Sequence, residues 1–404
     1  MRTAFLFPGQ GCQTVGMGKP FFDKFAYVRD IYEEIGEMLG IDFPALCFEG
    51  PAKELNRTIY AQPAIFATSL AAFRVFVRET GIEPAVCCGH SMGEITALTA
   101  AGAIAVPEAL ELIRVRGRLM EDCAGRRQGA MTAVMTVDPV SLQELCWHIA
   151  QELGLVLAVS NYNSTQQSVV SGDLAAIQAL ETKLESRGIR SVRLKTSGAF
   201  HCLLMKDASD AFRQVLDRYI FHSPAIPVLS NMSGDLYSDQ NNIPDILSQQ
   251  ILSPVRWKKC MESIRRYADQ AVDVSPNGVL RRFMGKDDIP CVHFRAIGQL
   301  QDFRDLPDTP PSGVMNPSAA EAFLKRCIVA AISVKNSNFD NRQYESQVIT
   351  PYRELESMLK EVKAGAVLDR EGREAVLSRV YAIFQHKILS DDVLMAWMDE
   401  LAMF

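Results

Sequence analysis

The 404-residue sequence lacks the features that mark nucleic-acid-binding and metal-binding proteins. Positive charge is not in excess, because 42 Lys and Arg residues stand against 48 Asp and Glu residues and the net charge is −6. No global positive field would therefore hold a nucleic acid. The ten cysteines show neither metal-ligand spacing nor a disulfide-like ladder, which predicts buried thiols in a reducing compartment and no metal site.

Long apolar runs are also missing. The most apolar longer window, AIFATSLAAFRVFV, is interrupted by Arg74 and is shorter than the ~20 residues that a bilayer requires. The amino terminus, MRTAFLFPGQG, has too short an apolar run for a signal peptide, and Pro8 and Gly9 break it. We therefore predict a cytoplasmic protein that neither crosses a membrane nor binds nucleic acid.

What the sequence does contain is a strongly patterned α/β chain, 48% apolar and 22% charged. Short apolar strands alternate with helical stretches over residues 1 to about 125, which is typical of a parallel α/β domain. From about 129 to 196 the order is strand, helix, strand, strand, helix, strand, as in a ferredoxin-like unit. We predict a large catalytic domain over 1–127 and 198–302, and an inserted small subdomain over 128–197.

The remainder of the chain reads as a linker over 303–318 and a helical extension over 319–404. Pro, Asp, Ser and Gly dominate the linker. One helix is expected to begin at Thr350 and to end at Gly365, and a last helix to begin at Ser390. The last two helices are expected to carry apolar residues at helical spacing, namely Leu377, Val380, Tyr381, Phe384, Ile388, Val393, Trp397 and Leu401. These stripes pack either on the chain's own large domain or on a partner protein.

The segment GHSMGE, residues 89–94, has the spacing G-x-S-x-G between an apolar strand and a helical stretch. Glycines at these positions permit a tight strand-to-helix turn that exposes the serine hydroxyl, so Ser91 is a candidate nucleophile. A hydroxyl needs a base, and six histidines compete for that role. We favour His201, because it lies where the chain returns from the small subdomain to the large domain, and sites form at such junctions.

The segments FPGQGCQTVGMG, GHSMGE, VRGRLM, NYNSTQQSVVSG, GAFH and SPVRW occur in this order. In these motifs and their spacing, residues 1 to about 302 resemble the malonyl-CoA:acyl carrier protein transacylases and the acyltransferase domains of polyketide synthases. The resemblance implies an α/β-hydrolase-like large domain with an inserted ferredoxin-like subdomain. That fold agrees with the strand order expected above.

The resemblance also assigns roles. It makes Ser91 the acyl nucleophile and His201 its general base. It implies that the backbone carbonyl of Gln250 orients the histidine, and that the backbone amides of Gln10 and Met92 form the oxyanion hole.

Substrate selectivity is implied to rest on two further residues. Arg116 would pair with the free carboxylate of a malonyl group, because a planar guanidinium grips both oxygens. Phe200, in GAFH, would crowd a methyl branch on the substrate, an effect worth only ~1–3 kcal/mol. Gly198 and Met92 depart from the residues usual in the family at these two positions.

The resulting hypothesis is transfer of malonyl from malonyl-CoA, through an ester on Ser91, to the phosphopantetheine thiol of an acyl carrier protein. No resident cofactor is expected. Two alternatives stay open: a thioesterase of the same fold, which Arg116 argues against, and a non-catalytic subunit that binds carriers.

The carrier is expected to meet basic residues at the rim of the cleft, or the same residues would hold CoA phosphates. The candidates are Arg126, Arg127, Arg256, Lys258 and Lys259. The C-terminal ~100 residues resemble the tails of freestanding transacylases that serve polyketide or lipopeptide assembly lines in trans.

Overall fold

The computed structural model describes residues 2–196, 198–285, 288–300, 317–334, 343–368 and 370–387, together with Leu394, Met398 and Leu401. The chain divides into two compact units. The catalytic unit comprises Met1–Val75 and Glu83–Asp305, and the C-terminal unit comprises Phe76–Ile82 and Leu306–Phe404. Each is described by itself.

A five-stranded parallel sheet forms the centre of the catalytic unit. Its strands are β1 (Thr3–Phe7), β2 (Pro84–Gly89), β7 (Val228–Leu229), β8 (Gln270–Asp273) and β9 (Cys291–His293), in the order β7-β2-β1-β8-β9. Every residue of β1 is buried, as expected for a parallel strand covered on both faces. Ala4 and Leu6 pack in one core cluster with Trp257, while Phe5 and Phe7 contact Phe73 with ring centroids 5.0 and 5.6 Å apart.

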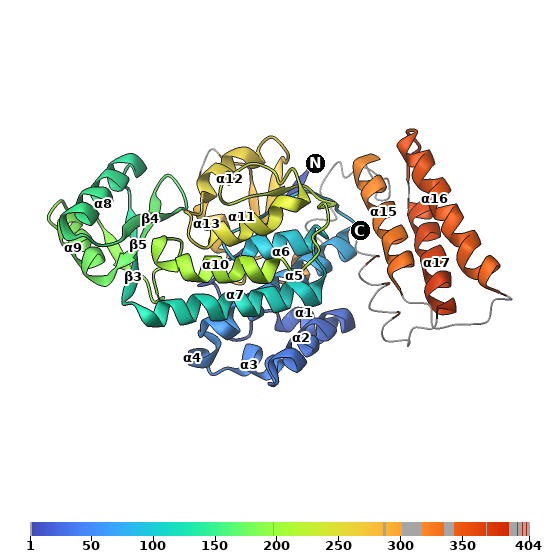
Figure 1. Ribbon diagram of the computed structural model, residues 1–404, viewed down its shortest axis with the longest axis horizontal. Helices are drawn as coiled ribbons and strands as arrows, with labels where there is room; N and C mark the ends of the chain where they lie inside the picture. Colours follow the sequence, from blue (N-terminus) through green and yellow to red (C-terminus); the bar gives the residue numbers. More distant parts are fainter. Residues whose placement is uncertain are drawn as a thin grey trace. The chain divides into compact units, whose positions relative to one another are not determined.

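Helices cover both faces of this sheet. Figure 1 shows α11 and α12 on one side of the unit and α1 to α4 on the opposite side. Their bounds are α1 Lys19–Lys24, α2 Ala26–Leu39, α3 Phe43–Glu49, α4 Ala52–Leu55, α5 Thr58–Thr80, α6 Gly93–Ala100, α7 Val106–Arg126, α10 Lys206–Leu216, α11 Ile243–Gln250, α12 Trp257–Ile264 and α13 Val279–Phe283. Of the described helices, α5 alone is long and apolar enough to cross a membrane, but 83% of its apolar window is buried inside the protein.

The small subdomain interrupts the catalytic unit between α7 and α10. It consists of β3 (Gly129–Met135), α8 (Pro139–Leu153), β4 (Leu157–Tyr162), β5 (Gln167–Asp173), α9 (Leu174–Glu185) and β6 (Ser191–Arg193). Its antiparallel sheet has the order β4-β5-β3-β6. This is the ferredoxin-like arrangement, so the predicted fold class is confirmed.

The two faces of this sheet have different partners. Ala130 and Val134 of β3 pack in the core cluster with residues of α8 and α9, which lie on the outer side of the strands in Figure 1. Met131 and Ala133, which alternate with them, line a cavity on the other face. The period of two therefore sends one face of β3 to the core and the other to the cleft.

The C-terminal unit contains α15 (Pro317–Ser333), a π-helical turn (Glu345–Ile349), α16 (Thr350–Lys363) and α17 (Arg370–His386). Helices α15, α16 and α17 contact one another pairwise. Helix α16 begins at Thr350 as predicted, but the π-helical turn precedes it without a break. The Lys387 ammonium is buried and donates hydrogen bonds to the carbonyls of Ala331 and Val334, at 2.6 and 3.0 Å, which ties the ends of α15 and α17 together.

The expected apolar stripe of α17 is partly wrong. Among its described side chains Val376, Val380, Ile383 and Phe384 are buried. The predicted Leu377 is half-buried and Tyr381 is 37% exposed, because the buried face is centred nearer Val376 and Ile383. Leu401 is helical and buried, as expected. The predicted positions Ile388, Ser390, Val393 and Trp397, and residues 303–316 of the predicted linker, lie outside the described residues.

Candidate active site

Ser91 lies in the turn between β2 and α6, with φ at +54°. The two flanking glycines are required sterically. A Cβ at Gly89 would lie 1.8 Å from the carbonyl oxygen of Gly93, and a Cβ at Gly93 would lie 2.3 Å from that of Phe7. No side chain fits at such distances, so the G-x-S-x-G spacing reflects close backbone packing at this turn.

His201 faces the serine hydroxyl. Its Nε2 lies 2.7 Å from Ser91 Oγ, and its Nδ1 lies 2.8 Å from the backbone carbonyl oxygen of Gln250. A carbonyl only accepts, so Nδ1 carries the proton and Nε2 is free to accept from Ser91 Oγ. Burial, and then the positive charge of Arg116, lower the pKa of His201 to about 3, which keeps the imidazole neutral at physiological pH.

The guanidinium of Arg116 is 1% exposed and reaches the same hydroxyl. Its Nη2 donates to Ser91 Oγ at 3.2 Å and to Gln250 Oε1 at 3.1 Å, and its Nη1 donates to Gln62 Oε1 at 3.2 Å. Among the described residues its Nε has no hydrogen-bond partner, and no carboxylate lies within ion-pair distance of the group. Burial lowers the pKa of Arg116 to about 10, so the side chain remains a cation at neutral pH.

Gln10, in the loop after β1, and Met92, in the turn before α6, line the same cavity as Ser91. In the part of the chain that the structure describes, the backbone amide of neither residue donates a hydrogen bond within the protein. The Gln10 side chain is held from behind, since its Nε2 donates to Thr58 Oγ1 at 3.1 Å and its Oε1 accepts from Gln62 Nε2 at 3.4 Å. Two amides thus remain available for an oxyanion.

A cavity of about 580 Å³ lies between the large domain and the small subdomain. Apolar side chains of Met120, Met131 and Val169 contribute to its lining. The predicted site residues that it brings together are Ser91, His201, Arg116, Gln10, Met92 and Phe200. Gln250 stands behind this lining and contacts Ser91, His201 and Arg116. No group of three or more metal-binding side chains occurs among the described residues.

Sequence reasoning missed a second set of site residues. Gln62 supports Arg116 and Gln10, as described above. Glu94, which is 0% exposed, accepts hydrogen bonds from Tyr237, Gln250 and Asn231. Asn231 also holds the turn: its Oδ1 accepts from the Ser91 amide at 2.6 Å, and its Nδ2 donates to the Gly89 carbonyl at 2.5 Å. The sequence offered one signal for these residues: Glu94 is the acidic residue in the otherwise uncharged helix α6, and a buried acid requires hydrogen-bond partners.

The predicted basic rim is largely paired with acidic residues. Arg127 makes two hydrogen bonds to the carboxylate of Asp173, at 2.6 and 2.8 Å. The weaker ion pairs are Arg126 with Asp207, Lys258 with Glu262 and Lys259 with Asp235, at 3.5, 3.8 and 3.9 Å. Arg256 is exposed.

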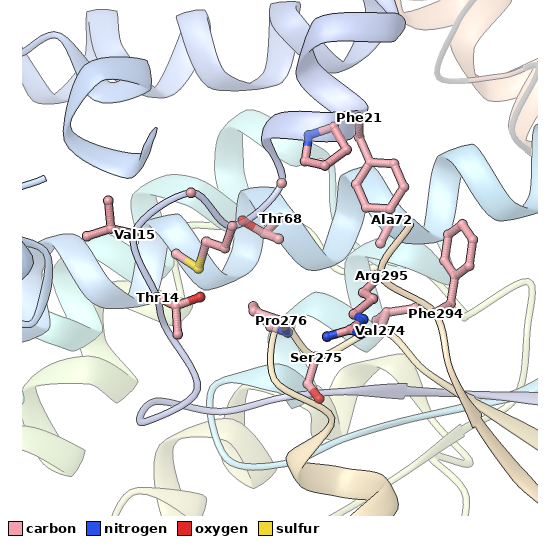
Figure 2. A pocket seen from close by; sticks show the side chains of 14 residues that line it. Thr14, Val15, Phe21, Thr68, Ala72, Val274, Ser275, Pro276, Phe294 and Arg295 are labelled. Carbon is pink, nitrogen blue, oxygen red and sulfur yellow. The ribbon is translucent and has the colours of Figure 1, made fainter. Parts of the chain in front are cut away.

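A second cavity, of about 230 Å³, is shown in Figure 2. Phe21 and Phe294 line one side of it and Thr14 and Val15 another, with Arg295 between them in this view. It contains none of the predicted site residues. The loop after β1 serves both cavities, because residues 9–13 line the first and residues 14–18 line the second.

Comparison with known proteins agrees with this geometry. Residues 4–287 match the acyl transferase domain family, the class that the fold and the serine turn define. A malonyl CoA-acyl carrier protein transacylase of Bacillus subtilis is 34% identical over 361 residues, which is 89% of this chain and 89% of that protein. The corresponding protein of Escherichia coli strain K12 is 35% identical over 279 residues, 69% of this chain and 90% of that one. This chain belongs to the malonyl-CoA:acyl carrier protein transacylase family.

A solved structure extends the comparison. A malonyl-transacylase in complex with its type II polyketide synthase acyl-carrier protein matches with a TM-score of 0.72 at 31% identity. The match covers 76% of this chain and 99% of that one. The match with the Bacillus subtilis relative spans 361 of the 404 residues, so it includes part of the predicted C-terminal extension.

Proposed function

We propose that this protein transfers a malonyl group from malonyl-CoA to the phosphopantetheine thiol of an acyl carrier protein. In the first half-reaction His201 Nε2 takes the proton of Ser91 Oγ as this oxygen attacks the thioester carbonyl. The carbon–sulfur bond breaks, and the proton passes to the departing CoA thiolate. In the second, the carrier thiol attacks the Ser91 ester, His201 accepts its proton and returns it to the serine oxygen.

The observation that carries the substrate assignment is the unpaired charge of Arg116. An isolated buried cation is strongly unfavourable, and this one lies 3.2 Å from the nucleophile with neutral amide oxygens as its other acceptors. The free carboxylate of a malonyl group would supply the missing negative charge and place the thioester carbon near Ser91 Oγ. A thioesterase acting on neutral acyl groups would gain nothing from such a cation.

The remaining groups complete the proposal. The amides of Gln10 and Met92 would stabilise the oxyanion, and removal of one such donor typically costs a hundred- to a thousandfold in rate. Phe200, 5% exposed in the lining of the cavity, would crowd a branched acyl group. The reaction needs no resident cofactor, since CoA enters as part of the substrate.

We further infer that the reaction takes place in the cytoplasm and serves an assembly line in trans. All ten cysteines are free thiols, and nine of them are buried, which suits a reducing compartment. The trans-acting role is supported by the helical C-terminal unit, because its sequence resembles the tails of freestanding transacylases that serve assembly lines.

Intact-protein mass spectrometry tests the proposal. After mixing with malonyl-CoA, wild type and the control Ser357→Ala, an exposed serine of α16, should gain one malonyl group, and Ser91→Ala none. Addition of a phosphopantetheine-loaded carrier should move the group to the carrier. Release of free malonate without carrier acylation would favour the thioesterase, and no adduct on wild type would favour the non-catalytic binding subunit.

A further inference from the structure

We propose that Glu94 is a positioning residue for acyl transfer, and that it acts by fixing the side-chain amide of Gln250. This inference rests on the proposed function, because its effect is expressed in the handling of the malonyl carboxylate. The family resemblance implies one role for Gln250, through its backbone carbonyl. The structure gives the side chain of the same residue a second role.

Only hydrogen-bond donors surround the Glu94 carboxylate among its contacts in the described chain. Tyr237 Oη and Gln250 Nε2 each donate at 2.5 Å, and the backbone amide of Asn231 lies 3.2 Å from both oxygens. An ionised carboxylate accepts all of these, whereas a protonated one would have to donate. Burial raises the pKa of Glu94, and these hydrogen bonds oppose the rise.

The carboxylate and the backbone carbonyl of Ser91 together fix which way the Gln250 amide faces, and the charge of Glu94 makes it the stronger of the two acceptors. A glutamine side chain can rotate so that its oxygen and nitrogen exchange places, but an anion at Glu94 requires the NH₂ group on its side. Gln250 Oε1 is then directed at Arg116 Nη2, at 3.1 Å. In the opposite orientation the NH₂ group would face the guanidinium, two donors would oppose each other, and Arg116 would lose an anchor.

Gln250 thereby contacts Ser91, His201 and Arg116. Gln250 Nε2 also donates to the backbone carbonyl of Ser91 at 2.9 Å, while the Gln250 carbonyl holds His201. The amide in addition separates two buried opposite charges, Glu94 and Arg116. Such an arrangement offsets part of the cost of burying the cation while leaving the guanidinium free to pair with a substrate carboxylate.

The experiment compares Glu94→Gln with wild type and with Glu111→Gln, a matched change on α7 at an ion pair with Arg114 on the same helix. kcat/KM is measured for malonyl-CoA and for acetyl-CoA, which has no free carboxylate. Misplacement of a substrate-positioning group by about 1 Å costs on the order of 100-fold. We therefore expect Glu94→Gln to lower the malonyl to acetyl ratio of kcat/KM by roughly 10- to 100-fold, and Glu111→Gln to leave it unchanged.

A double variant tests whether Glu94 acts through Arg116. In an Arg116→Ala background the Glu94→Gln change should no longer alter the ratio, because the group on which Glu94 acts is missing. If Glu94→Gln folds poorly, Tyr237→Phe removes one donor to the carboxylate and keeps the charge, and should shift the ratio in the same direction by a few-fold.

An equal fall for both substrates in Glu94→Gln, or an unchanged ratio in Tyr237→Phe where Glu94→Gln does not fold, would overturn the inference. So would a further drop of the ratio in the double variant. Failure of the proposed function gives a different result, because wild type itself would then form no malonyl adduct.

Discussion

Removing the guanidinium of Arg116 should change the choice of acyl donor more than the ability to form an ester. On the proposed function, Arg116→Ala would delete two charge-assisted hydrogen bonds to the malonyl carboxylate, each worth about 1.5–3 kcal/mol in a buried site. A combined loss of about 3–6 kcal/mol corresponds to a roughly 10²- to 10⁴-fold lower kcat/KM for malonyl-CoA. Acetyl-CoA has no carboxylate to lose, so its kcat/KM should be maintained.

The assay is acylation of the enzyme by each donor, followed by mass spectrometry at several donor concentrations. Arg114→Ala is the matched control, because that side chain pairs with Glu111 at 2.6 Å on the same helix, and its kinetics should equal those of wild type. Arg116→Lys keeps the charge but not the two-pronged geometry, and should fall between wild type and Arg116→Ala. An unchanged donor preference in Arg116→Ala would refute the assignment.

Three further predictions concern the pH response, the turn and the junction of the subdomains. Because the pKa of His201 is lowered to about 3, kcat/KM for acylation should show no inflection near pH 6.5. The unfolded chain binds a proton at this histidine below its usual pKa and the folded chain does not, so the free energy of unfolding should fall by about 1.4 kcal/mol per pH unit below pH 6.5. Urea unfolding of wild type and His201→Gln, compared from pH 7 to pH 4.5, measures this difference, and parallel curves would contradict it. Gly93→Ala should cost about 3 kcal/mol or more or prevent folding, since its Cβ meets backbone oxygen at 2.3 Å. Gly125→Ala, with no atom within 4 Å of its Cβ, should stabilise α7 by about 0.5–1 kcal/mol in thermal unfolding, and equal effects of the two changes would refute the steric account. Arg127→Ala should cost about 1–2 kcal/mol in urea unfolding, because Asp173 is 8% exposed and loses two hydrogen bonds, a value reduced for the exposure of the arginine. Arg126→Ala, whose pair is exposed on both sides, should cost at most about 0.5 kcal/mol, and a larger effect than that of Arg127→Ala would count against this reading of the rim.

The parts of the site that the sequence predicts are those encoded by local backbone geometry. The glycines around Ser91 are forced by contacts within the turn and with β1, so their spacing is visible in the sequence. The order of strands and helices along the small subdomain follows from short apolar runs, such as that of β3 with its five consecutive buried residues, that alternate with helical stretches. These patterns depend on neighbours that are close in the chain or on a period that the chain itself displays.

The supporting residues could not be derived in this way. Asn231 reaches the Ser91 amide across 140 residues, and Gln250 reaches Glu94 across 156. Asparagine and glutamine are common in loops and helix ends, so their roles depend on the tertiary placement of segments that no short pattern connects. The buried face of α17 differs from the predicted one for a similar reason. Packing against α15 and α16 buries Val376 and Ile383 and leaves Tyr381 exposed.

The backbone conformations of Ser91 and His201 affect how this protein responds to selection for heat resistance. Both residues have φ near +55°, a conformation that costs an L-residue with a side chain roughly 1–2 kcal/mol. A glycine at either position would remove this strain, offset in part by about 0.5–1 kcal/mol of additional unfolded-chain entropy. At His201 a glycine would also forfeit two hydrogen bonds of a ring that is 4% exposed, so the opposition between thermal tolerance and turnover falls on Ser91. A library screened for melting temperature alone would not protect this proposed nucleophile, and any stabilised variant has to be retained on a measurement of acyl transfer.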